Sequence, residues 1–184
     1  MPLTPEVLAA QGEVVAWLGS LDVSFAPDEE LWFTIDGVEG PRQIGSDASG
    51  GALVLLPAQN VLYVSSEGRA GIIAASFEAF VQLVVAHPYW LDILRFSAGG
   101  DLQEMRRAAD ALETTLDDED DINAAREEIR DRLNLPEAAD PIDALYQAVA
   151  ASDAIVRATD GSPFTTLFNR FSIDNNPMLR NAAA

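Results

Sequence analysis

The stretch 52–85, ALVLLPAQNVLYVSSEGRAGIIAASFEAFVQLVV, decides the fold class of this chain. It contains three short apolar runs that are typical of strands: 52–56, Val61–Val64 and Ala70–Ala74. Ser76 then opens a predicted helix, Phe77–Ala86, because a serine hydroxyl caps the first turn of a helix well. Since short turns join the runs with no helix between them, they predict an antiparallel sheet with this helix packed on one face.

Upstream of this stretch, the pattern predicts one helix and two more strands. Apolar residues recur every three or four positions, which predicts a single helix that begins at Pro5 and ends near Leu18. Strand-forming residues fill 31–35, and the turn dipeptide Asp36-Gly37 predicts a return strand over 38–44. We expect the strand 31–35 to belong to the same sheet as the strands of the central stretch.

Beyond Gly99-Gly100 the chain is predicted to be helical. Four further helices are expected to begin at these residues: Asp101, Asp121, Asp140-Pro141 and Ser162-Pro163. The residues after Ser172 have little pattern, so we expect 173–184 to form a loosely held tail. The whole pattern predicts the α+β class, with a mainly antiparallel sheet flanked by helices and a helical C-terminal half, in a single domain over 1–172.

Composition limits the classes of protein and of chemistry. The chain has 184 residues, 48% of them hydrophobic, which suffices for one domain with a sizeable core. No apolar run approaches the roughly 18 residues that a membrane-spanning helix needs. The N-terminal segment has no basic region, so we predict no secretory signal and a cytoplasmic protein. The absence of cysteine excludes disulfides, thiolate metal sites and thiol catalysis.

The chain is strongly acidic. Thirty Asp and Glu residues stand against eleven basic residues, all of them arginine, and the formal net charge is −19. Fourteen of the acids and five of the arginines lie between 101 and 140. Such a field repels nucleic acid and speeds the encounter with a basic protein, so we expect a basic protein partner, no nucleic acid and no membrane. The alternative is that the acidity only keeps the protein soluble.

The densest acidic run is the candidate partner-binding site, and it consists of Asp117, Asp118, Glu119, Asp120 and Asp121. Adjacent carboxylates in a linear run point in different directions, whereas an EF-hand loop needs ligands at alternate positions with a glycine in the middle. The interpretation without a binding role is a solvated loop between two capped helices. The functional interpretation is a patch that binds a basic partner, and a metal site is the least favoured of the three.

Residues for catalysis or for holding a cofactor are sparse. His87 is the single histidine, lacks the sequence context of a catalytic triad, and precedes a proline at a predicted helix end, where it fits a C-terminal cap. One histidine without cysteine does not make a zinc site, and a chain without lysine has no Walker A loop. We therefore predict no cofactor and no metal. Phe77 and Phe80 share one apolar stripe and are expected in the core.

The central stretch resembles the SUKH superfamily, many of whose members are bacterial immunity proteins. The resemblance rests on three strands followed by a helix with the start Ser-Phe-Glu-x-Phe, seen in ASFEAF at 75–80. The chain is most similar to a branch of that superfamily that ends in a helical extension with an Asp-Pro-x-Ala helix, for which DPIDAL at 140–145 is the match. The region of resemblance spans about 31 to 150.

The resemblance implies a fold and a mode of action, not a catalytic set. Members of the superfamily bind and neutralise diverse toxins, many of them nucleases or deaminases. We therefore expect a non-enzymatic cytoplasmic protein whose acidic surface, with Asp117–Asp121 as its centre, covers a basic toxin domain. Two alternatives stay open: a carboxylate-dependent enzyme, which would show a concave pocket with two or more acids of raised pKa, and a dimeric regulatory or scaffold protein that pairs through its helical half.

Overall fold

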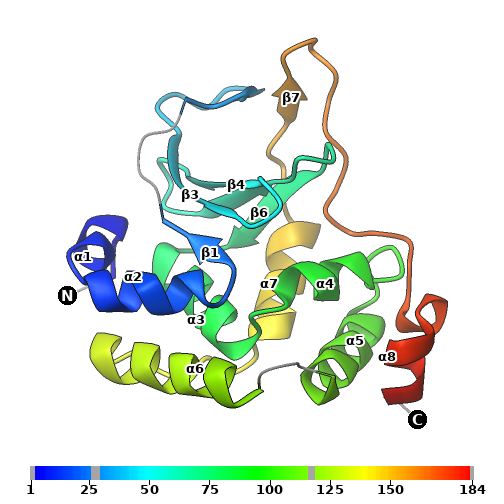
Figure 1. Cartoon of the computed structure of the whole chain (residues 1–184). Helices are drawn as coiled ribbons and strands as arrows, with labels where there is room; N and C mark the ends of the chain where they lie inside the picture. The colour runs from blue at the N-terminus through cyan, green and yellow to red at the C-terminus, as the bar shows by residue number, and fades with distance from the viewer. Residues whose placement is uncertain (1–2, 26–29, 116–118, 183–184) are drawn as a thin grey trace.

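The centre of the molecule is a five-stranded antiparallel sheet (Figure 1). The computed structural model describes residues 3–25, 30–115 and 119–182. Along the sheet the order is β1-β3-β4-β5-β6, and every neighbouring pair is antiparallel. The strands are β1 (Val23–Ser24), β3 (Arg42–Asp47), β4 (Ala52–Leu55), β5 (Val61–Val64) and β6 (Ala70–Ala74). The predicted strands of the central stretch are thus confirmed as consecutive antiparallel neighbours.

Helices cover one face of this sheet and continue into an outer helical layer (Figure 1). They are α1 (Pro5–Ala9), α2 (Gly12–Gly19), α3 (Phe77–Ala86), α4 (Trp90–Arg95), α5 (Leu102–Thr114), α6 (Glu119–Leu133), α7 (Pro141–Ala150), the 3-10 helix η1 (Ile173–Asn175) and α8 (Pro177–Ala182). The predicted α+β class with a largely helical C-terminal half is confirmed. Among the described residues, none of the helices combines the length and the apolarity needed to cross a membrane.

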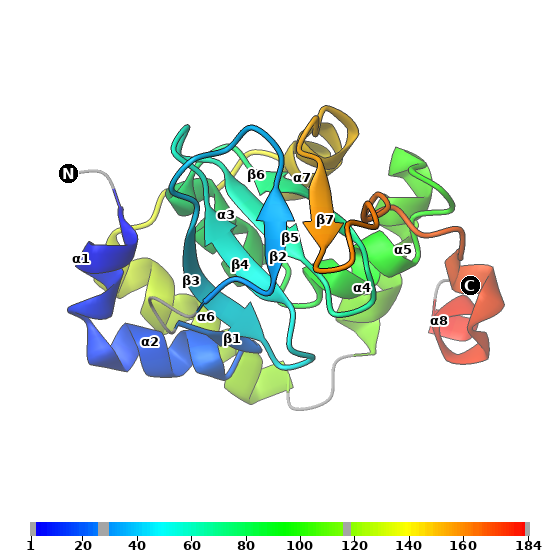
Figure 2. The same ribbon diagram turned by 90° about the horizontal axis from the view of Figure 1, so that it is seen from above.

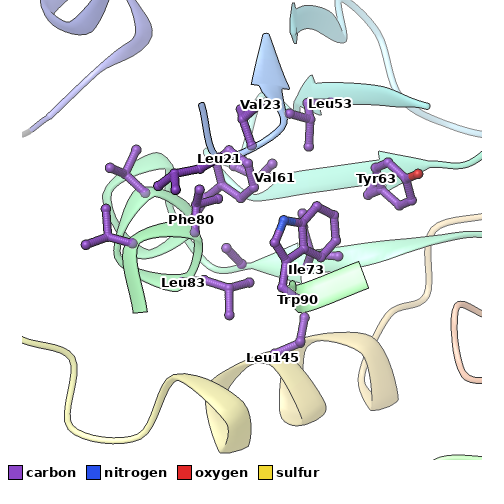
Figure 3. Close-up of a cluster of buried hydrophobic side chains, with 14 of the residues drawn as sticks. Leu21, Val23, Leu53, Val61, Tyr63, Ile73, Phe80, Leu83, Trp90 and Leu145 are labelled. Carbon is purple, nitrogen blue, oxygen red and sulfur yellow. The ribbon is translucent and has the colours of Figure 1, made fainter. Parts of the chain in front are cut away.

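The core lies between the sheet and the helices α3, α4 and α7. Ser76 caps α3 by accepting a hydrogen bond from the amide of Ala79, as its position in the sequence predicts. Phe77 and Phe80 are both buried, which confirms them as core residues. Figure 3 shows how Phe80, Trp90 and Leu145 converge from three helices on the apolar side chains of the sheet.

A two-stranded ribbon covers the opposite face of the sheet (Figure 2). It pairs β2 (Phe33–Ile35) with β7 (Val156–Ala158), so the prediction that 31–35 joins the main sheet and turns back into a hairpin is wrong. Gly37 and Gly40 both have positive φ and lead the chain away from β2 before β3 begins. The buried side chains of β2 then pack on the outer face of β4 and β5, because those strands are apolar on both faces and need a cover on each side.

Two predicted helices have a different form in the structure. The N-terminal helix is broken at Ala10-Gln11 into α1 and α2, and the break allows Leu8 and Leu18 both to be fully buried. The helix expected from Ser162-Pro163 is absent, and the segment is extended. Its backbone instead bonds to open edges of sheet, with Thr165 accepting from the Ala70 amide. A strand at the edge of a sheet has unpaired N–H and C=O groups, and these form hydrogen bonds with the backbone of an extended segment beside it.

The last described residues are also held more firmly than we expected from their lack of pattern. Ile173 and Leu179, in η1 and α8, are buried against Ala108 and Ala111 of α5. A side-chain bond from Arg107 to Asp174 spans the same contact. Within 173–182, therefore, the chain packs on α5 instead of forming a loosely held tail.

Candidate binding site

The acidic run predicted as a partner site opens α6. Asp117 and Asp118 lie outside the described residues, while the backbone of Glu119, Asp120 and Asp121 forms the first turn of the helix. A loop ending at a cap on Asp121 was expected, but acidic residues in the first turn are favoured by the positive end of the helix dipole. The Asp121 side chain is exposed, and within the described part of the chain it has no hydrogen bond or ion pair.

Arginines neutralise part of the acidic stretch 101–140. Arg126 binds both carboxylate oxygens of Glu113 at 2.7 and 3.1 Å, and so ties α6 to α5. Arg106 reaches Asp140, which precedes α7, at 2.7 Å, whereas Arg107 pairs with Glu104 within α5. The remaining exposed acids of α5 and α6 keep this side of the molecule negative.

Two cavities share several lining residues, and the smaller of them reaches the start of α6. The smaller, of about 200 Å³, is lined by Ile122 of α6 together with residues around α4. The larger, of about 430 Å³, lies between the turns that follow β3 and β5, the helix α4 and the extended segment 167–171. Three aspartates line both cavities: Asp22, Asp47 and Asp92. We call Asp22, Asp92 and Asp121 the acidic face.

Asp47 is a buried carboxylate with all its bonds made inside the protein. Its Oδ1 accepts from the amide and hydroxyl of Ser49 and from the amide of Gly51, and its Oδ2 accepts from the Tyr63 hydroxyl. Burial alone raises the pKa of Asp47, but the bonds from Tyr63, Ser49 and Gly51 outweigh it and hold that pKa below its ordinary value. A Cβ on Gly51 would lie 2.7 Å from Asp47 Oδ2, so glycine is needed there.

The other two cavity aspartates have unoccupied carboxylates. Asp92 is half-buried on α4, and burial raises its pKa, while the charge of Arg95 acts in the opposite direction. Neither Asp92 nor Asp22 has a side-chain hydrogen bond or ion pair within the described residues. Asp22 has a φ of 59°, a left-handed conformation that aspartate tolerates better than most residues.

Two arginines border the larger cavity, and they differ in how they are held. Arg69 donates to the carbonyl oxygens of Thr166 and Phe168 at 3.1 and 3.2 Å, and so fixes the extended segment that forms one wall. Arg95 is exposed, with its guanidinium 5.9 Å from the centre of the Phe96 ring. In the described structure Arg95 makes no ion pair, not even with Asp92 three residues earlier on the same helix.

His87 lies apart from these cavities. It occupies the C-cap position of α3, as predicted, with Nδ1 3.4 Å from the Tyr89 hydroxyl. Burial lowers the pKa of His87, so the ring is neutral at neutral pH and caps the helix without adding a positive charge. It therefore has a structural place in the fold.

The sequence contains little local sign of this cavity. Asp47 is the last residue of β3, and Ser49 and Gly51 follow it at the spacing of an Asx-type turn, which is the one local signal. Asp22 and Asp92 are isolated aspartates that meet only because α4 packs beside the turn before β1. No three His, Cys, Asp or Glu side chains among the described residues are placed to hold a metal ion. Comparison of the chain with models of protein families, with curated proteins and with solved structures finds no match.

Proposed function

We propose that this protein is a non-enzymatic cytoplasmic binding protein that neutralises a basic protein partner, in the manner of an immunity protein covering a toxin domain. The partner class comes from the resemblance to the SUKH superfamily, in which the targets include nucleases and deaminases. The partner would lie across the acidic face and the adjoining first turn of α6. The charge of the chain, −19 overall, sets the sign of the partner.

The observation that carries the proposal is a set of carboxylates without hydrogen bonds or ion pairs in the described structure, two of which line the same cavities. Asp22 and Asp92 line both cavities, and Asp121 precedes the cavity residue Ile122 on α6. Carboxylates that make no bond inside the protein are free to bond to a partner. Exposed charges of this kind steer a basic protein toward the surface and orient it, and so they act mainly on the association rate.

The cavity supports binding more than catalysis. An enzyme was expected to show two or more acids of raised pKa in one pocket, but the pKa of Asp92 is raised while that of Asp47 is lowered. Asp47 also has both carboxylate oxygens engaged in hydrogen bonds inside the protein, and these bonds favour its ionised form over a role in proton transfer. For the scaffold alternative, the exposed Trp32 and Ile155 lie beside the β2–β7 ribbon, while Met178 of α8 is an exposed large apolar side chain on the helical half.

Surface-plasmon kinetics against purified basic toxin domains of the nuclease and deaminase classes would test the proposal. A quadruple variant removes four charges of the acidic run: Asp117→Asn, Asp118→Asn, Asp120→Asn and Asp121→Asn. It should slow association several-fold and change dissociation less, because exposed charges act mainly on the association rate. The effect should be measured at low salt, since screening limits the field to about 8 Å at physiological ionic strength. A matched control neutralises four acids elsewhere: Glu30, Glu39, Glu137 and Asp153. Equal association rates for both variants and the unmodified protein would refute the role of the acidic run.

A further inference from the structure

We propose that the larger cavity holds one arginine side chain of the partner, with its guanidinium bonded to the carboxylate of Asp92. The inference rests on the proposed function, since it assigns the anchor of the same basic partner. It joins three features that meet in one place: a half-buried carboxylate without a partner, apolar walls beside it, and an excess of acidic over basic side chains around it.

The size and the walls of the cavity suit a long side chain with a polar end. Its volume of about 430 Å³ lies within the range of about 300–1,000 Å³ typical of ligand sites. Leu91 and Leu94 of α4 and Leu167 and Phe171 of the extended segment supply apolar surface. The methylene groups of an arginine can pack on such surface while its charged end reaches a carboxylate.

The charges around the cavity favour a cation. Four acids line it, against two arginines: Asp22, Asp47, Glu67 and Asp92 against Arg69 and Arg95. Arg69 donates to two backbone carbonyls and makes no ion pair with Asp92 in the described structure. The carboxylates are not gathered closely enough to hold a metal ion among the described residues. A guanidinium spreads its five donors over a wider area and is less strongly hydrated than an ammonium, so it fits this arrangement better than a lysine.

The position of Asp92 is fixed by the residues behind it. Tyr63 donates to Asp47 and packs edge-on against Trp90, with ring centroids 5.1 Å apart. Trp90 is the first residue of α4 and is buried, so this contact anchors the helix on which Asp92 stands. Asp47 and Tyr63 thus act as positioning residues for the cavity wall, and Asp92 is the residue that contacts the ligand.

The first test uses a small probe, N-acetyl-arginine methylamide, titrated into ¹⁵N-labelled protein and followed by amide chemical shifts. Binding should shift the amides of α4 and of 167–171. Asp92→Asn should weaken binding by at least about tenfold, because it removes a charge-assisted bond. Arg95→Gln should instead strengthen it a few-fold, since Arg95 is the nearest competing cation. A structural role alone would not change affinity in opposite directions for these two variants.

The neutral isostere N-acetyl-citrulline methylamide is the matched control, and it should not bind at the same concentrations. Equal binding of the two probes, or arginine binding that is unchanged in Asp92→Asn, would overturn the proposal. Melting curves of both variants verify that they are folded, and Asp153→Asn, an exposed aspartate elsewhere, should leave probe binding unchanged.

The second test separates this proposal from the proposed function. With the basic partner, Asp92→Asn should raise the dissociation rate by at least about tenfold, because removing one member of a desolvated charge pair acts on dissociation. A partner that dissociates from Asp92→Asn at the unmodified rate would overturn the arginine anchor, while the association test of the acidic run would still stand. Probe binding without any binding of basic proteins would overturn the proposed function instead.

Discussion

Tyr63→Phe removes one hydroxyl group from a buried pair and leaves the rest of the core in place. The Tyr63 side chain is 2% exposed and Asp47 is 7% exposed, so water does not readily replace the lost donor. The ring of phenylalanine keeps the edge-on contact with Trp90. What changes is the bonding of Asp47 Oδ2, whose donor is the Tyr63 hydroxyl.

The expected cost is that of one hydrogen bond to a charged group, about 1.5–3 kcal/mol. We therefore expect Tyr63→Phe to lower the free energy of unfolding by about 2 kcal/mol at neutral pH. For a chain of this length, each kcal/mol moves the melting temperature by about 2–4 °C, so the variant should melt about 4–8 °C lower. Tyr146→Phe is the matched control, because the Tyr146 ring packs on Phe168 and its hydroxyl makes no hydrogen bond in the described structure.

The pH dependence has a definite sign. The pKa of Asp47 is lowered in the folded state from 3.8, so its ionised form contributes stability that is fully present above pH 3.8 and is lost as the pH falls through the folded-state value. Without the Tyr63 bond, fewer hydrogen bonds oppose the effect of burial, so the pKa of Asp47 is lowered less and this contribution is smaller. The stability difference between the two proteins should therefore be largest at neutral pH and shrink on acidification below 3.8.

Urea unfolding of the unmodified protein, Tyr63→Phe and Tyr146→Phe, at neutral pH and at a series of acidic pH values, measures both effects. The reasoning fails if Tyr63→Phe unfolds at the same urea concentration as the unmodified protein. It fails equally if the stability deficit grows as the pH falls, since protonation of Asp47 would then not be the linked event.

Three further changes test the packing and the caps. Phe80→Ala should cost about 3–5 kcal/mol in urea unfolding, because the ring is fully buried, and an unchanged midpoint would show that α3 does not pack as described. Gly51→Ala should cost about 1–3 kcal/mol through its clash with the side chains of Tyr63 and Asp47, whereas Gly12→Ala, with open space around it, should not destabilise; equal melting temperatures would contradict this. Asp140→Ala should cost about 1 kcal/mol by thermal melting, because Asp140 caps α7, and no change would show the cap to be dispensable.

Elements defined by local chemistry were predictable from the sequence. The helix Phe77–Ala86 has a serine cap before it and a stripe of apolar residues along it, and both act within a few residues of each other. The same holds for α7, where Asp140 caps and Pro141 starts the helix. The consecutive strands β4, β5 and β6 were predictable because short turns leave neighbouring strands little choice of partner.

Pairings between distant segments were not predictable in this way. The strand β2 pairs with β7, which lies more than a hundred positions later in the chain. The residues 33–35 do not indicate which strand they will pair with. The segment 163–171 has apolar spacing that fits a helix, yet it is extended because Gly68 and Ala70 offer backbone bonds at a sheet edge. In this segment, hydrogen bonding to the sheet edge outweighs the local preference for a helix.

The sequence by itself determined the composition, the sign of the surface charge, the α+β class and the elements with strong local caps, because these follow from residues that are close along the chain. Only the tertiary structure decided which strand pairs with β2 and where the cavity lies. Asp22, Asp47 and Asp92 come from three separate segments and share a site because α4 packs beside the turn before β1 and the end of β3. That convergence depends on long-range packing, which no short stretch of the sequence encodes by itself.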